Sequence, residues 1–138
     1  MATKPASGRD LLEKYRDVFR FFKGMIAFRK AHPSIHRMTF WREDVHWYGA
    51  GGPVDFSPDS RTLAYGLRGQ SQNDNDLYVM INAHWEDADF AIQEGYGWRR
   101  VIDTSLPGPQ DILDPGNEEP IGTVQYRMKA RSVVVLIK

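Results

Sequence analysis

Four histidines are the residues most suited by type to metal binding or acid–base chemistry. His32 and His36 are four residues apart, but Pro33 between them should break the shared helical face that a metal-binding pair requires. His46 and His84 lie at the edges of predicted strands and have no partner at a fixed spacing. The sequence therefore predicts neither a metal site nor a cofactor.

A run of carboxylates follows the most apolar segment of the chain. Glu86, Asp87 and Asp89 invite comparison with the carboxylate pair of a glycosidase. Such a pair needs two carboxyl groups on either side of a cleft, one with a pKa raised by an apolar pocket. Three carboxylates within four residues are explained more simply as a solvated loop. Since no nucleophile motif and no phosphate-binding glycine loop is present either, we expect no catalytic residues.

Tryptophans are the remaining candidates for ligand contact: Trp41, Trp47, Trp85 and Trp98. An exposed indole can stack on a sugar ring, because its face is apolar and its edge is polar. In a small β domain, however, most tryptophans pack in the core. Trp47 and Tyr48 lie beside the glycine-rich loop 49–53 and are the predicted carbohydrate contacts, with Trp85 as a third.

Length and charge restrict the classes of protein that remain. A chain of 138 residues suits one domain that buries roughly two-thirds of its unfolded surface. Lys and Arg total 18, as do Asp and Glu, and there is no cysteine. The balanced charge gives no net attraction to nucleic acid or to an acidic membrane. Because no apolar signal segment or membrane span is visible, we expect a soluble, cytoplasmic protein without nucleic-acid or membrane partners.

Residues 1–34 are predicted to form one long N-terminal helix. Ser7 and Asp10 make a capping box, and Pro33 disfavours helical geometry at the residue before it, so the helix should end near Ala31. Its apolar arc is wider than one packed face can cover. The large apolar residues are Leu11, Leu12, Tyr15, Val18, Phe19, Phe21, Phe22, Met25, Ile26 and Phe28. The spare face is expected to form a two-fold dimer through Val18, Phe19, Phe22 and Met25.

Residues 35–138 predict an antiparallel β-sandwich of seven or eight strands, so the chain as a whole is mainly β. The segment 76–85 is apolar on both faces, as is 133–137, and both should be buried on both sides. The segment 124–130 alternates and should keep one wet face. Shorter strands are expected at 39–41, 45–48, 63–67, 89–93 and 98–103. A proline-rich loop spans 104–120.

Five segments, in this order, resemble the C-terminal end of isoamylase-type glycogen debranching enzymes of the α-amylase family. They are 28–33 (FRKAHP), 60–65 (SRTLAY), 77–85 (LYVMINAHW), 98–104 (WRRVIDT) and 130–136 (ARSVVVL). The resemblance covers nearly everything from Tyr15 onward and implies the last helix of a catalytic barrel followed by a C-terminal β-sandwich domain. One departure is Pro53-Val54-Asp55-Phe56, which stands where family members tend to have Pro-Asp-Trp.

The resemblance also implies a role. Family members hydrolyse α-1,6 branch points with an aspartate nucleophile, a glutamic acid and a second aspartate, all upstream of the matched region, so none of these roles falls on a residue of this chain. We expect a non-catalytic domain that covers and stabilises the barrel. The alternatives are an α-glucan-binding module, which exposed indoles near loop 49–53 would favour, and an interaction domain for a separately encoded partner such as the barrel. An exposed apolar helix face would favour the latter.

Overall fold

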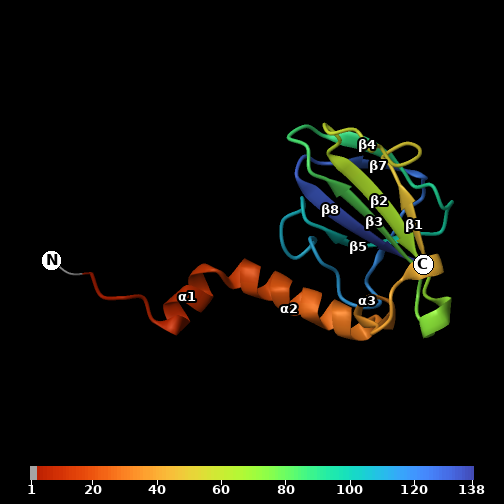
Figure 1. Ribbon diagram of the computed structural model, residues 1–138. Coiled ribbons are helices and arrows are strands. Elements are labelled where there is room, and N and C mark those ends of the chain that lie inside the picture. The colour runs from red at the N-terminus through yellow and green to blue at the C-terminus, as the bar shows by residue number, and fades with distance from the viewer. Residues whose placement is uncertain (1–2) are drawn as a thin grey trace.

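The computed structural model describes residues 3–138, in which helices come first and strands follow (Figure 1). The α-helices are α1 (Gly8–Lys14), α2 (Arg16–Ala31) and α3 (Pro33–His36), with short 3-10 turns η1 (Arg42–Asp44) and η2 (Gln70–Gln72). The strands are β1 (Val45–Tyr48), β2 (Thr62–Leu67), β3 (Leu77–Asn82), β4 (Ala88–Ala91), β5 (Arg99–Asp103), β6 (Glu119–Pro120), β7 (Gln125–Met128) and β8 (Ser132–Ile137).

The strands form two antiparallel sheets, which confirms the predicted mainly-β sandwich. The larger sheet has the order β1-β2-β3-β8-β5-β6, and the smaller one pairs β4 with β7. The two segments predicted to be buried on both faces, β3 and β8, are neighbours at the centre of the large sheet, with Tyr78 opposite Leu136 and Met80 opposite Val134. Strands with the longest apolar runs occupy the centre because only there are both faces covered.

One face of the large sheet, here called the inner face, packs on the small sheet. Tyr78 and Met80 from β3 point to this side, where they meet Phe90 of β4, Met128 of β7 and the buried Trp98. Alternation along β7 places Tyr126 and Met128 in this core and leaves Gln125 and Arg127 in solvent, as predicted from the period of two.

The opposite, outer face of the large sheet is covered by helix α2. Phe21, Met25 and Phe28 of α2 pack on a second cluster that includes Leu77 and Val135. Two contacts with the loop after β5 fix the helix. Arg20 donates two hydrogen bonds to Asp111 at 2.7 and 2.8 Å, and a side chain at Gly24 would come within 3.0 Å of Ile112, so only glycine allows this approach without displacing Ile112.

The predicted single helix is wrong in one respect, because it is interrupted at Tyr15. The capping box between Ser7 and Asp10 forms as expected, but Tyr15 has φ −111° and ψ 30°, ending α1 and starting α2. No residue of α1 is buried, so no packing holds this turn in helical geometry. In Figure 1, α1 and the start of α2 extend beyond the edge of the sandwich.

The predicted strand at 39–41 is also wrong. Residues 37–41 form bends and irregular chain between α3 and η1. β1 is the edge strand of the large sheet. A strand at 39–41 would have to pair with the outer side of β1 and would itself become an exposed edge strand. Trp41 instead turns inward and packs on Tyr65, with ring centroids 5.4 Å apart.

The inner core supplies a stability prediction. Phe90 is 0% exposed, whereas Phe56 is 91% exposed on a loop. We expect Phe90→Ala to lower the free energy of unfolding by about 3–5 kcal/mol, through lost burial and the cavity left behind, and Phe56→Ala to change it by less than about 0.5 kcal/mol. Urea unfolding monitored by tryptophan fluorescence measures both. Equal losses would show that the two sheets do not share a packed core.

Candidate functional site

The three predicted carbohydrate contacts do not form one surface. Trp47 lies on the outer face of the large sheet, where its ring is 5.1 Å from that of Tyr65. Its neighbour Tyr48 points to the inner face and packs on Tyr78 at 5.9 Å, as expected for successive residues of a strand. Trp85 is exposed on the loop after β3, against His84. Trp47 and Tyr48 therefore lie on opposite faces of the sheet, and carbohydrate contact at Trp47, Tyr48 and Trp85 stays a prediction.

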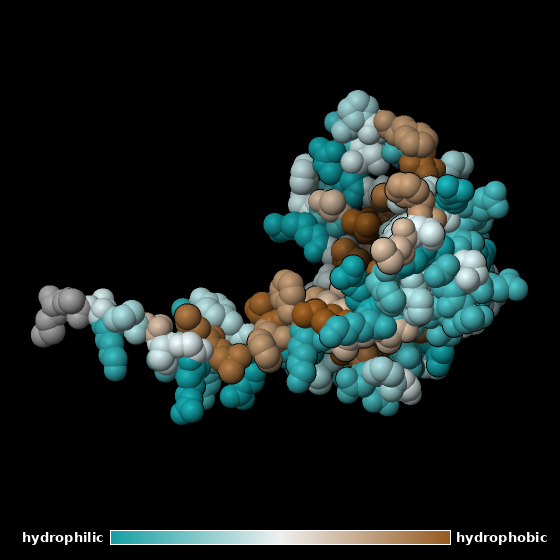
Figure 2. All heavy atoms as spheres, turned by 60° about the horizontal axis from the view of Figure 1, so that its bottom comes forward, coloured by the Kyte–Doolittle hydropathy of each residue, from teal (hydrophilic) through white to brown (hydrophobic). Residues whose placement is uncertain are grey.

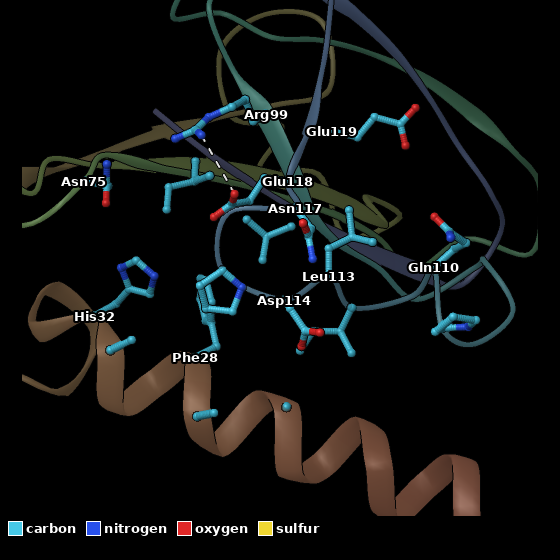
Figure 3. A pocket seen from close by; sticks show the side chains of 18 of the residues that line it. Phe28, His32, Asn75, Arg99, Gln110, Leu113, Asp114, Asn117, Glu118 and Glu119 are labelled. Atoms are coloured by element: carbon cyan, nitrogen blue, oxygen red, sulfur yellow. Dashed lines mark ion pairs between the residues drawn. The ribbon is translucent and has the colours of Figure 1, made fainter.

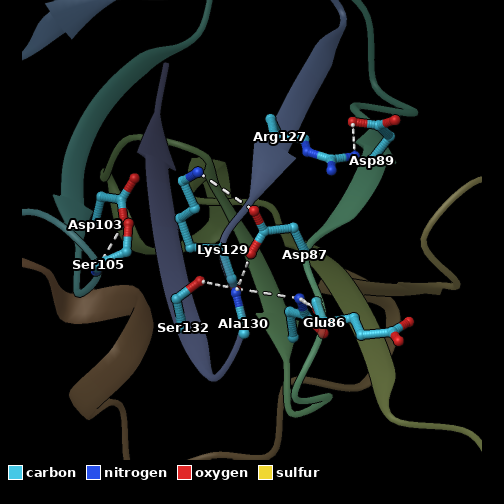
Figure 4. Close-up of polar contacts among 10 residues, drawn as sticks. Glu86, Asp87, Asp89, Asp103, Ser105, Arg127, Lys129, Ala130 and Ser132 are labelled. Atoms are coloured by element: carbon cyan, nitrogen blue, oxygen red, sulfur yellow. Dashed lines mark hydrogen bonds and ion pairs between the residues drawn. The ribbon is translucent and has the colours of Figure 1, made fainter.

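Of the carboxylates after β3, Asp87 and Asp89 are occupied by structural contacts, whereas Glu86 is exposed and its carboxylate has no partner within the described chain (Figure 4). Asp87 accepts hydrogen bonds from the backbone N–H of Ala130 at 2.9 Å and from Lys129 Nζ at 3.3 Å. The bond from Ala130, followed by that from Lys129, lowers the pKa of Asp87. Asp89 pairs with Arg127 across the small sheet at 3.1 Å. These groups tie the loop after β3 to β7 and the turn before β8, and they do not face one another across a cleft.

His32 is tied into the fold at the end of α2. Its Nδ1 lies 2.8 Å from Asp74 Oδ1, and the backbone N–H of Ser34 donates to the other carboxylate oxygen. Burial by itself would raise the pKa of Asp74, but the hydrogen bonds from His32 and Ser34 outweigh it and lower the pKa. Within residues 3–138, no group of three or more histidines and carboxylates gathers that could hold a metal ion.

Glu94 is a buried carboxylate whose pKa is raised. Its side chain is 2% exposed and lies 2.6 Å from Arg68 Nη2, yet neither carboxylate oxygen has a hydrogen bond of good geometry within the described chain. Burial is the main cause of the raised pKa, and the Arg68 charge opposes it. The carboxylate lies directly over Gly66, where a side chain would collide with it. A raised pKa is often a mark of catalysis, but Glu94 lines neither of the grooves described below. The nearby carboxylate of Asp76 is paired with the same Arg68, at 3.3 Å.

Helix α2 presents a second apolar side that the sandwich leaves open. Phe22 is 64% exposed, and Val18, Phe19 and Ile26 are each 55% exposed. Met25, the fourth residue predicted for self-association, is half-buried and packs on the outer face of the sheet instead. Leu11, Leu12 and Tyr15 of the preceding turns are exposed as well. Figure 2 shows hydrophobic side chains along the arm that α1 and α2 form.

This open side continues into a groove of about 500 Å³ between α2 and the outer face of the sheet. We call it the apolar groove. Phe22 and Ile26 form one wall, Trp41 and Tyr65 another, and Ile81 and Val133 lie on the sheet side. Arg29 is the single charged residue among those that line it. The apolar groove together with Val18, Phe19, Phe22 and Ile26 is called the docking face. A contiguous apolar surface of this kind marks an interaction site in a folded protein.

A second groove, of about 910 Å³, lies on the other side of α2 (Figure 3). It runs between α2 and the loop that precedes β6, over Phe28 and Ile112. Its charged groups Arg99 and Glu118 face each other at 3.8 Å, and Glu118 also accepts a hydrogen bond from the N–H of Gly116. Asp114 and Glu119 line the groove as well, and Glu119 is paired with Arg100 at 2.9 Å.

Comparison with known proteins identifies the sandwich. Residues 44–137 match the family model for the C-terminal region of isoamylase (Isoamylase, C-terminal). The chain belongs to this family. It is 33% identical over 130 residues to isoamylase 3, chloroplastic, of Oryza sativa subsp. japonica, with 91% of this chain and 16% of the relative covered. It is 31% identical over 140 residues to the isoamylase of Flavobacterium sp, with 85% and 18% covered.

The match to isoamylases includes the helical part. An alignment over 91% of the chain needs more residues than 44–138 can supply, so it extends into the helices that precede β1. The isoamylase of Pseudomonas amyloderamosa is 30% identical over 133 residues, with 86% of this chain covered. The chain spans about a sixth of the length of these relatives. It is thus a C-terminal domain of the isoamylase type, as the resemblance implied.

The sequence did not reveal the apolar groove or the contacts that fix α2. The groove is formed by residues from α2, α3, the α3–β1 connection and four strands, and no sequence pattern connects them. The glycine at position 24, in the middle of an otherwise apolar helix, was the available signal, because a glycine there often marks the close approach of another segment.

Glu94 supplies a pH prediction. Its pKa is raised above the ordinary value of 4.5 in the folded protein, so the folded state binds this proton more tightly than the unfolded state, and the Glu94 contribution to stability falls as the pH rises from about 4.5 through the raised pKa. Glu94→Gln removes this titration. We expect the free energy of unfolding of the variant, relative to wild type, to increase over that pH range.

Urea unfolding from pH 4 to pH 7 measures the difference, with Glu86→Gln on the exposed loop as the matched control. A difference that stays constant with pH, or that falls as the pH rises, would show that the attraction of Arg68 outweighs the burial of the carboxylate.

Proposed function

We propose that the chain serves as the C-terminal domain of an enzyme that hydrolyses α-1,6 branch points in α-glucan, and that its docking face packs on the catalytic barrel of that enzyme. The observation that carries the proposal is the docking face itself, an apolar side of α2 that continues into a groove over the central strands. The relatives bear the name isoamylase, and the chain spans about a sixth of their length.

Covering the docking face with a partner is favourable, because it removes apolar side chains from water. Complete burial of a large apolar side chain contributes about 1.5–3 kcal/mol. Val18, Phe19, Phe22 and Ile26 are each more than half exposed, so covering them contributes roughly 3–7 kcal/mol before the cost of association. A barrel that supplied this cover would be stabilised by the domain in return. The role is therefore structural, and bond cleavage belongs to groups outside this chain.

Two kinds of partner could bury the docking face. A barrel in the same or a separate polypeptide would cover it with a different surface. A second copy would cover it with the same residues, since a two-fold interface uses one patch twice. Self-association through Val18, Phe19 and Phe22 and a cytoplasmic location stay predictions from the sequence. Within residues 3–138, no helix is long and apolar enough to span a membrane.

A second candidate function is contact with α-glucan at Trp47. This indole is half-exposed at the edge strand β1, and Tyr65 and Trp41 extend the aromatic surface behind it, with ring centroids 5.1 and 5.4 Å apart. Such a row offers an apolar face to a sugar ring. It would assist a debranching enzyme by holding substrate, without taking part in cleavage.

A chimeric enzyme tests the structural role. The segment of the Flavobacterium isoamylase that matches this chain is replaced by the chain, and the truncated enzyme is the reference. We expect the chimera to melt at a higher temperature than the truncated enzyme and to release reducing ends from a branched α-glucan, whereas the chain alone releases none. Phe22→Asp in the chimera should lower its Tm by about 4 °C, because a carboxylate would be buried in the contact.

The matched control is Tyr96→Asp, which places the same charge on an exposed ring in the loop between β4 and β5. Reducing-end release by the chain alone would overturn the non-catalytic assignment. A chimera no more stable than the truncated enzyme, or one equally sensitive to both substitutions, would overturn the docking of the barrel on α2.

The glucan candidate is tested with maltoheptaose. One exposed indole adds on the order of 1 kcal/mol to sugar binding, so a dissociation constant in the millimolar range is expected. Tryptophan fluorescence follows the titration, and Trp47→Ala should abolish the change while Trp85→Ala preserves it. If maltoheptaose has no effect in the millimolar range, or if the two variants behave alike, Trp47 is not a glucan contact.

A further inference from the structure

We infer that the partner on the docking face is a different protein surface, an apolar helix bordered by carboxylates. This inference rests on the proposed function, because it requires that a partner binds the docking face. It goes further by specifying that the partner's surface is negatively charged. The observation behind it is the distribution of cations on α2. The helix sequence contains five basic residues and one acidic residue, and those that lie beside the docking face have no partner within the described chain.

The border of the docking face away from the sandwich is basic. At 100° per residue, Lys23 and Lys30 follow one another along one row of α2, next to the exposed Phe19 and Ile26. Both lysines are exposed and lie in no ion pair among the described residues. The other cations of α2 differ, since Arg20 is bound to Asp111 at 2.7 Å and Arg16 lies 3.9 Å from Glu13.

The groove itself contains one further cation. Arg29 is the single charged residue lining the apolar groove, and it too lies in no ion pair among residues 3–138. A partner that filled the groove with apolar side chains alone would take this guanidinium out of water without compensation, which is unfavourable. A carboxylate on the partner can meet it with two parallel hydrogen bonds. The chemistry that fits is thus an apolar ridge with acidic residues on its flank.

These charges disfavour the other occupants. In an antiparallel two-fold pair of this chain, the row of Lys23 and Lys30 would meet the same row of the second copy, so the contact would bring like charges together. An anionic membrane would attract the row, but a flat bilayer surface does not enter a groove between a helix and a sheet. A helix laid in the groove satisfies both the apolar walls and the cations.

Binding of two designed peptides by the full chain tests this inference. Both are amphipathic helices with the same Leu and Phe face, one flanked by Glu and the other by Lys. We expect the Glu-flanked peptide to bind about tenfold more tightly at low salt, and this preference to shrink at high salt because the charges are exposed. Lys23→Gln/Lys30→Gln should remove most of the preference. The matched control Arg127→Gln/Lys129→Gln removes the same charge from β7 and the residue that follows it, and should leave the preference intact.

Fluorescence anisotropy of labelled peptides measures the affinities. Equal binding of both peptides, independent of salt, would support binding at the docking face but contradict the inference that the partner is acidic. Binding of neither peptide would overturn the docking face and with it the proposed barrel contact. Sedimentation of the wild-type chain as a dimer that Phe22→Asp dissociates would assign the face to a second copy, and tighter binding to phosphatidylserine vesicles than to either peptide would assign it to a membrane. Both results would overturn the inference.

Discussion

The pairing of β3 with β8 is the constraint on which the rest of the structure depends. Both strands are apolar on both faces, so the sheet that they centre must be covered twice. On the inner side, β4 and β7 provide the cover with Phe90 and Met128. On the outer side, α2, α3 and the loop after β5 contribute Phe28, Ile35 and Ile112 to the cover, and they leave the apolar groove open. The asymmetry between the two faces is what gives the domain a surface for a partner.

The position of α2 follows from two contacts rather than from burial alone. The Arg20–Asp111 ion pair and the close approach of Gly24 to Ile112 fix the helix against the loop after β5. This orientation turns Phe21, Met25 and Phe28 toward the sheet and leaves Val18, Phe22 and Ile26 in solvent. Because the apolar arc of the helix is wider than the contact that the sheet offers, one part of it stays open wherever the helix is placed.

The polar residues of the sandwich serve its architecture. Asp87 ties the turn before β8 to the loop after β3, and Asp74 joins the end of α2 to the loop before β3 through His32. Glu94 is buried next to Arg68 over Gly66. The carboxylate oxygens of Asp74 and Asp87 accept hydrogen bonds from structural donors, and Glu94 is held by its ion pair with Arg68. This use of charge is consistent with the proposed role of the domain as a docking surface.

The sequence by itself determined the fold class, the capping box, the central strands and the family. Each of these depends on local periods or on segments short enough to be recognised singly, such as the alternation of Leu77, Val79 and Ile81. The break at Tyr15, the absence of a strand at 39–41 and the opposite orientations of Trp47 and Tyr48 were decided by tertiary structure. So were the apolar groove and its one arginine. These features depend on which distant segments share a face, and a pattern along the chain carries no information about the segment that will lie opposite it.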